Sequence, residues 1–153
     1  LLYFSIYYIK NKKQLFDNCF SWLAPGGYML LHTVNRDKFD PILPSGSPFY
    51  IIPPQKYAKT RVTETSVVFD KFKYKADFKL NGDTAKFVET FVQNEPVDGV
   101  TQPVRQNEHT LFMTSQQSIL DQAMNAGFII SSASRMTKIG YEHQSITVLQ
   151  KPV

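Results

Sequence analysis

Hydrophobic and polar residues change their spacing several times along this chain, and each change predicts a different element. Residues 2–8 are almost all aromatic or aliphatic, which is typical of the end of a buried strand. Residues 12–23, after a capping Asn11, carry apolar side chains at helical spacing, and the Pro-Gly-Gly sequence that follows ends the helix. Residues 28–34 are a nearly continuous apolar run, as in a strand buried on both faces. Together they predict a β-α-β unit with parallel strands.

The middle of the chain shows the cleanest alternation. Aromatic and aliphatic residues there alternate with charged ones: Phe72, Tyr74, Ala76, Phe78 and Leu80 against Lys71, Lys73, Lys75, Asp77 and Lys79. This period of two predicts a strand with one apolar and one charged face. The Asn81-Gly82 pair predicts a hairpin with a type I′ turn, and residues 85–92 form its returning arm. Residues 60–69 and 109–113 are expected to complete an antiparallel meander.

A proline-rich segment precedes the meander. Five of the nine prolines lie between residues 41 and 54. Because proline removes a backbone donor and prevents helix formation, we expect residues 35–57 to form a long ordered loop or lid.

The C-terminal part repeats the order of a helix followed by strands. Thr114 and Gln117 have the spacing of a capping box at the start of a helix, and Gly127 lies where a glycine commonly ends one. Residues 128–130 begin a strand, and residues 141–151 form a second one. With no internal repeat or linker, the sequence predicts a single α/β domain.

The composition is that of a folded protein. The chain has 153 residues, of which 42% are hydrophobic and 14% aromatic, and this excludes a disordered chain. Its net charge of +4 favours acidic partners only weakly. The single cysteine, Cys19, cannot form an internal disulfide, so we expect a reducing, cytoplasmic location. No apolar run approaches the ~20 residues of a membrane span, so no membrane partner is expected.

Two short motifs within this order of elements carry a resemblance to a known family. Residues 23–28 read Leu-Ala-Pro-Gly-Gly-Tyr at the start of the strand at 28–34, and residues 126–128 read Ala-Gly-Phe before the terminal strands. The arrangement resembles the C-terminal half of a class I S-adenosylmethionine-dependent methyltransferase. In that family a Leu-x-Pro-Gly-Gly turn leads into the fifth strand, and Ala-Gly-Phe opens the sixth. The resemblance covers residues 1–35 and 114–151.

The resemblance implies a fold and a division of the chain. The fold would be α/β, half of a Rossmann-like methyltransferase sheet with strand order 4-5-7-6, an antiparallel last strand and an inserted antiparallel β meander. Residues 1–35 and 114–153 would form the α/β core, and residues 36–113 a β insertion that serves as a substrate lid. The reaction would transfer a methyl group from S-adenosylmethionine to an N or O nucleophile of a small molecule.

The family's glycine-rich cofactor loop has no counterpart here. The sequence contains no Gly-x-Gly, and the family's first three strands would lie upstream of Leu1. We therefore expect this chain alone to bind no S-adenosylmethionine and to be inactive. The apolar edge strand at residues 2–8 would be a pairing hazard. We expect it to be covered by a second copy of the chain, giving a homodimer, or by the insertion.

The resemblance also implies cofactor and catalytic residues. Phe4, Ser5 and Tyr8 lie at the end of the family's fourth strand, where α/β folds bind ligands and family members contact the cofactor. The alternative is that these residues simply pack in the core or along the edge. His32 is the candidate base toward the methyl acceptor. A histidine on an apolar strand is, however, more often a satisfied core residue.

Substrate contacts are expected after the strand at 28–34. Asn35, Arg36 and Asp37 follow its carboxyl end, and an arginine there suits a carboxylate or phosphate of the substrate. A local Arg-Asp ion pair explains the same residues. Tyr57, at the end of the proline-rich segment, completes the predicted substrate site.

Other kinds of site receive less support. His109 and His143 have no Cys or carboxylate at metal-ligand spacing, so no metal site is predicted. Cys19 lies on the apolar helix face and is expected to be an inert thiol. The basic hairpin at 71–92 allows an alternative function, a non-enzymatic module that contacts nucleic acid. Because lysines and aromatic rings fall on opposite faces of the strand, a solvated basic face is favoured and no nucleic-acid partner is expected.

Overall fold

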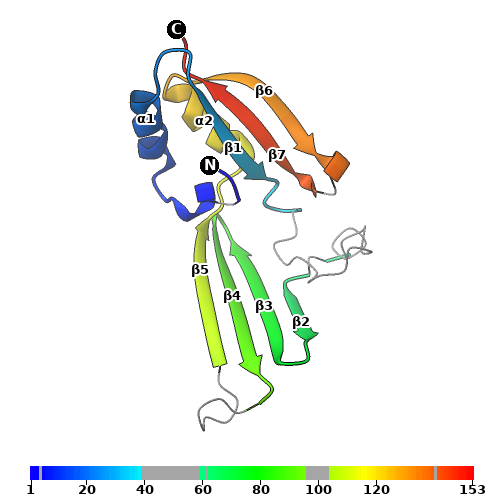
Figure 1. The fold of residues 1–153 in the computed structure, drawn as a ribbon. Coiled ribbons are helices and arrows are strands. Elements are labelled where there is room, and N and C mark those ends of the chain that lie inside the picture. The colour runs from blue at the N-terminus through cyan, green and yellow to red at the C-terminus, as the bar shows by residue number, and fades with distance from the viewer. Residues whose placement is uncertain (4, 39–58, 61, 96–103, 140) are drawn as a thin grey trace. The chain divides into compact units, whose positions relative to one another are not determined.

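The structure is a computed structural model that describes residues 1–3, 5–38, 59–60, 62–95, 104–139 and 141–153 (Figure 1). The chain divides into two compact units. One, which we call the core unit, comprises Leu1–Phe39 and Phe112–Val153. The other, the meander unit, comprises Asp40–Leu111.

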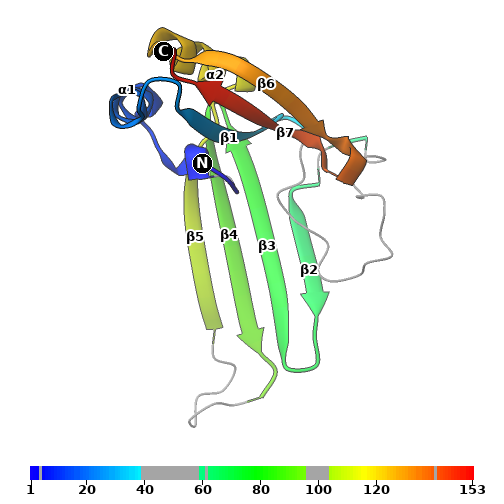
Figure 2. The same ribbon diagram turned by 45° about the horizontal axis from the view of Figure 1, so that its top comes forward.

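The core unit is built around a three-stranded sheet. Its elements are η1 (Ser5–Tyr8), α1 (Lys12–Trp22), β1 (Tyr28–Val34), α2 (Gln116–Asn125), β6 (Ile129–Met136), η3 (Thr137–Ile139) and β7 (Tyr141–Gln150). β7 lies between β1 and β6 and is antiparallel to both (Figures 1 and 2). This is the order expected for the last three strands of the sheet.

Residues 2–8 do not form the predicted strand. Ser5–Tyr8 is a 3-10 helix, and the Ser5 hydroxyl donates to the carbonyl oxygen of Leu2 at 2.6 Å. Ile6 and Tyr7 are consecutive and both fully buried. Successive side chains of a strand point to opposite faces, whereas a helical turn can bury two neighbours on one side. The aromatic run therefore reports burial here and not extended backbone.

Leu1 supplies the main-chain contacts beside β1. Its nitrogen donates to the oxygen of Leu30 at 2.7 Å, and its oxygen accepts the N–H of His32 at 2.9 Å. This is the bond pattern that a parallel neighbouring strand makes. The homodimer expected through residues 2–8 stays a prediction, but the described residues of that segment form no strand for pairing.

Side chains cap the amino ends of both helices. The Asn11 side chain accepts the N–H of Gln14 at 3.1 Å at the start of α1. The cap of α2 is Ser115, whose hydroxyl accepts the N–H of Ser118 at 3.1 Å. The expected cap, Thr114, is one residue too early, because the serine hydroxyl occupies the capping position.

Gly127 ends α2 with a φ of 105°. Its N–H donates to the oxygen of Met124, and the N–H of Phe128 donates to that of Ala123. A Cβ at Gly127 would lie 2.8 Å from the ring of Phe20, so the position requires glycine for space as well as for its dihedral angle. The Phe20 ring packs edge-on against Phe128, with centroids 5.2 Å apart.

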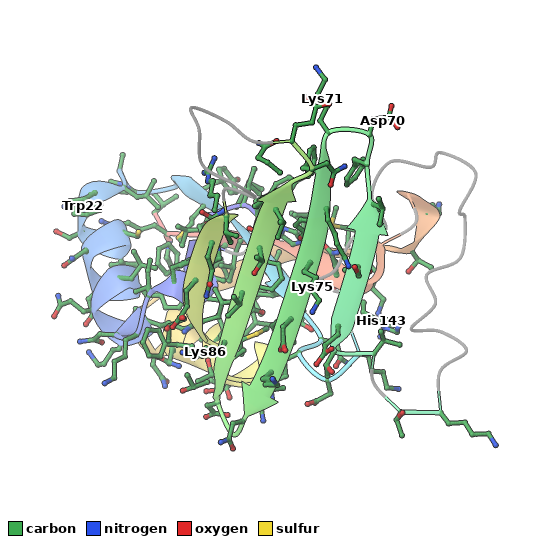
Figure 3. All side chains as sticks on the ribbon, turned by 90° about the horizontal axis from the view of Figure 1, so that it is seen from below. Trp22, Asp70, Lys71, Lys75, Lys86 and His143 are labelled. Carbon is green, nitrogen blue, oxygen red and sulfur yellow. The ribbon has the colours of Figure 1, made fainter. Side chains whose placement is uncertain are left out.

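The helices and the sheet share an apolar core. The buried side chains include Ile6, Tyr7, Phe16, Leu31, Val34, Ile119, Ala123 and Leu149. Trp22 departs from the predicted apolar face, because it is 76% exposed and its side chain extends away from α1 (Figure 3). It follows Phe16 by six residues, which places it about 120° around the helix from that buried side chain.

The meander unit is a four-stranded sheet. Its strands are β2 (Glu64–Val68), β3 (Phe72–Asn81), β4 (Thr84–Gln93) and β5 (Val104–Phe112), in that order. The hairpin between β3 and β4 is present, but Asn81 pairs with Thr84, so its loop is Gly82-Asp83. Only Gly82 has positive φ there, at 57°, as at the first central position of a type II′ turn. The hairpin prediction is confirmed, and its type I′ turn was wrong.

Candidate functional site

The carboxyl end of β1 and η1 form the part of the core unit where the sequence predicts a site. The N–H of Val34 donates to the Tyr7 hydroxyl oxygen at 2.9 Å, and that hydroxyl donates to Val34 O at 3.3 Å. Burial raises the pKa of Tyr7 to about 12, although its bond to Val34 opposes the shift. A neutral phenol bonded in both directions thus fixes η1 beside β1.

A buried lysine lies next to this phenol. Lys12 is 2% exposed, and its Nζ donates to the oxygens of Ile9 at 2.8 Å and of Phe112 at 2.7 Å. The same nitrogen is 5.9 Å from the centroid of the Tyr7 ring. Because its donors serve main-chain carbonyls, Lys12 joins the start of α1 to Phe112.

His32 is buried in β1 and bonded through both ring nitrogens. Its Nδ1 accepts the N–H of Tyr3 at 3.2 Å, which makes Nε2 the donor to the side-chain oxygen of Gln144 at 2.8 Å. Burial lowers the pKa of His32, and the bond to Gln144 opposes that shift in part. These contacts hold a neutral imidazole, and they connect β1 with Tyr3 and with β7.

The predicted substrate residues after β1 mostly bond to the protein itself. Asn35 donates its N–H to His143 O at 2.8 Å, and its side chain accepts the N–H of Asp37 at 3.2 Å. Arg36 Nη1 donates to Met113 O at 2.7 Å. Arg36 Nε and Asp37 Oδ1 are 3.8 Å apart, so the two residues form the local ion pair that the sequence left open, although Asp37 is exposed.

The predicted cofactor residues are only partly placed. The Ser5 hydroxyl donates its hydrogen bond to Leu2 O, and Tyr8 is 49% exposed. Phe4 and Tyr57 lie outside the described residues, as does most of the proline-rich segment. The structure thus brings His32 and the 35–37 turn to one end of β1, as their sequence positions require.

The described residues do not fit S-adenosylmethionine as a binding set. The cofactor presents an amino and a carboxylate group and ribose hydroxyls, all of which need polar partners. At this end of β1 the polar groups of Tyr7, Lys12, His32 and Arg36 are bonded within the protein.

Metal and thiol chemistry also receive no support from the described part of the chain. Within it, no three His, Cys, Asp or Glu side chains gather closely enough to hold a metal ion. Burial raises the pKa of the Cys19 thiol, which disfavours the reactive thiolate.

The lysines of β3 lie on one face of the meander unit, opposite the face that carries the strand's rings. The residues of β4 that face Lys73, Lys75, Asp77 and Lys79 are Val92, Thr90, Val88 and Lys86, and Figure 3 labels Lys75 and Lys86. None of these partners is aromatic. A surface that stacks nucleic-acid bases needs rings beside its cations. The β3-β4 hairpin therefore lacks that combination.

The opposite face carries a polar cluster that the sequence pattern did not single out. Tyr74 of β3 donates its hydroxyl to Glu89 Oε1 of β4 at 2.8 Å. The second oxygen of Glu89 is 3.6 Å from Nε2 of His109 on β5. The His109 ring stacks on Phe87 at 5.8 Å, and Tyr74 packs against Phe91 at 5.1 Å. The available signal was an acid between two phenylalanines, each two residues away.

Burial, the bond to Glu89 and the charge of that carboxylate together raise the pKa of Tyr74 well above its usual range. The phenol therefore acts as a donor to Glu89 and not as an acid. We call Tyr74, Glu89 and His109 the Glu89 cluster.

No protein-family model and no curated protein sequence matches this chain. Solved structures do. An S-adenosylmethionine-dependent methyltransferase from Clostridium acetobutylicum aligns with 98% of this chain at a TM-score of 0.68 and 13% identity. The CcbJ methyltransferase from Streptomyces caelestis aligns with 99% at 0.69 and 10%. CalS10, an amino pentose methyltransferase from Micromonospora echinaspora, aligns with 98% at 0.60 and 12%.

The chain has a methyltransferase-like fold. Identities this low show the fold alone, and the aligned chain spans 55–56% of the length of these enzymes. None of the helices in the described residues has the length and apolar composition that a membrane-spanning helix needs.

Proposed function

We propose that these residues are the C-terminal portion of an S-adenosylmethionine-dependent methyltransferase that acts on an N or O nucleophile of a small molecule. The observation that carries this proposal is the extent of the structural likeness. It takes in 98–99% of the chain, so it includes the meander as well as the β1-β7-β6 sheet.

We assign cofactor binding and substrate binding to different parts of the fold according to which residues are present. The remainder of the fold, about 44–45% of each similar enzyme, has no counterpart in the alignment. We assign the cofactor-binding loop to that remainder, because the described polar groups near β1 are engaged within the protein. Residues 36–113 are proposed as the substrate lid, and the 153 residues alone as inactive.

Methyl transfer requires in-line positioning of the acceptor and removal of one proton, so it needs few fixed catalytic groups. His32 is the proposed base. Its Nδ1 already accepts the Tyr3 N–H, so the proton could be taken only after that bond is released. Its bonded, neutral state supports an equally simple role, which is to hold Tyr3 beside β1.

The experiment is to express the longest open reading frame that contains these residues and to titrate it with S-adenosylmethionine by calorimetry. The demethylated product serves as a second ligand. We expect one-to-one binding of both. A folded product that binds neither ligand would contradict the proposal, as would a reading frame without a glycine-rich loop upstream.

A further inference from the structure

The two faces of the β3-β4 hairpin differ sharply in charge. One face carries the lysines of β3 together with Lys86. The other face is formed by Phe72, Tyr74, Ala76, Phe78 and Leu80 of β3 and by Ala85, Phe87, Glu89, Phe91 and Gln93 of β4. Among these ten residues, Glu89 is the one charged side chain. It projects from the face that lacks the hairpin's lysines.

Glu89 is hydrogen-bonded through only one of its two oxygens within the described residues. Its side chain is 23% exposed, and its one hydrogen bond within the described residues comes from the neutral phenol of Tyr74. Nε2 of His109 is 3.6 Å from its second oxygen, which is within ion-pair range but beyond hydrogen-bond distance. A carboxylate that is partly withdrawn from water is costly unless its oxygens are hydrogen-bonded. Its second oxygen therefore has the capacity to accept a bond from a positively charged donor.

The rings around Glu89 favour the same kind of ligand. Phe87 and Phe91 flank it on β4, and both are half-buried. Each is also held by a neighbour, Phe87 by the stacked ring of His109 and Phe91 by Tyr74. The faces of aromatic rings attract ammonium groups, and the attraction grows when water is excluded.

We propose that the Glu89 cluster binds the protonated amine of a small organic molecule. The carboxylate of Glu89 accepts the N–H groups, Tyr74 holds one carboxylate oxygen in place, and the rings of Phe87 and Phe91 surround the cation. As a statement about the methyl acceptor this rests on the proposed function. The acceptor is then an amine-bearing compound, and the ammonium form that binds must lose a proton before its nitrogen can accept a methyl group. As a statement about ligand binding it needs no cofactor.

The test uses the 153-residue chain and two probes of equal size, benzylammonium chloride and benzyl alcohol. Backbone amide NMR signals of Glu89, Phe91 and His109 are followed during each titration. We expect saturable shifts with benzylammonium and at least about tenfold weaker binding of the alcohol, since that factor corresponds to losing one charge-assisted bond. Equal binding of the two probes, or no binding of either, would overturn the proposal.

Glu89→Gln keeps the shape of the side chain and removes its charge. The matched control is Glu108→Gln, because Glu108 pairs with Lys86 at 2.6 Å on the lysine-bearing face. We expect the Glu89 variant to lose benzylammonium binding at least about tenfold and the Glu108 variant to retain it. If Glu89→Gln does not fold, the comparison of the two probes on the unaltered chain still tests the proposed ammonium site.

The two proposals can fail separately. The NMR titration contains no S-adenosylmethionine, so cofactor binding by the longer reading frame has no influence on it. If the longer reading frame binds the cofactor but the 153-residue chain does not bind benzylammonium, the methyltransferase proposal is retained and the cationic acceptor is rejected. The reverse result would retain the ammonium site and reject the methyltransferase.

Discussion

The Tyr7 hydroxyl makes two hydrogen bonds with the main chain of Val34, 27 residues further along the chain. One bond satisfies the N–H of Val34 and the other its carbonyl, at the end of β1 where the sheet stops. This contact replaces the strand pairing expected for residues 2–8. It also holds η1, which contains Ser5 and Tyr8, two of the residues that the family resemblance assigns to cofactor contact.

Tyr7→Phe should lower the free energy of unfolding by about 1–3 kcal/mol, because the buried N–H of Val34 loses its acceptor. Chemical denaturation followed by circular dichroism measures the change. Tyr28→Phe is the control, since Tyr28 is 58% exposed and its hydroxyl, among the described residues, accepts a bond only from the side chain of Gln150. We expect that control to change stability by less than about 0.5 kcal/mol. Equal effects of the two variants would refute the role given to Tyr7.

Alkaline pH should act through the same phenol. The pKa of Tyr7 is raised by burial to about 12, above its unfolded value of 10.0. The unfolded state therefore loses its proton first, so this stabilisation is complete below pH 10 and is lost as the pH rises towards 12. Unfolding free energies measured across this range should fall more steeply for the unaltered chain than for Tyr7→Phe. Parallel curves would count against the assignment.

Lys12 and Lys13 are neighbours with opposite surroundings. Lys12 is buried and bonded to two carbonyls, whereas Lys13 is exposed and pairs with Asp17 at 2.7 Å. Lys12→Met should cost at least about 2 kcal/mol, because two bonds from a charged donor are lost. Lys13→Met should cost no more than about 0.5 kcal/mol. Thermal and urea unfolding of the two variants measures these losses. A larger loss for Lys13→Met than for Lys12→Met would contradict the prediction.

Acid should weaken the core unit through His32. Its pKa is lowered in the folded protein by burial, so the unfolded state takes up a proton at higher pH. Stability from this group is present above about 6.5, the unfolded value, and is lost as the pH falls through the folded pKa. The His32 ring signals should therefore titrate below the usual histidine range in an NMR experiment. A midpoint above that range would show that the ring is not held neutral.

The sequence predicts most of the local structure because the deciding interactions are local. Apolar spacing in 12–23 and alternation in 71–80 each follow from the geometry of one element, and both are confirmed. The hairpin loop and the cap of α2 each lie one residue later than predicted. Asn81 and Gly82 both suit a turn, and Thr114 and Ser115 both suit a cap, so the sequence does not choose between neighbouring positions.

The conformation of residues 2–8 and the assembly of the Glu89 cluster could not be predicted from local pattern. An aromatic run is equally expected in a strand and in a buried turn, and the choice depends on Tyr7 meeting Val34 across the sequence. Glu89 and His109 come together through the pairing of separate strands. The positions of His32 and of residues 35–37 were predictable. Their bonding partners, which come from β7 and from Met113, were not.

The most direct test of the account is a calorimetric titration of the folded 153-residue chain with S-adenosylmethionine and then with its demethylated product. The account assigns the cofactor site to a part of the fold that these residues do not supply. It therefore predicts no binding heat from either ligand, in a sample that still unfolds cooperatively. Clear one-to-one binding would mean that this chain builds a complete cofactor pocket, and the account would be wrong.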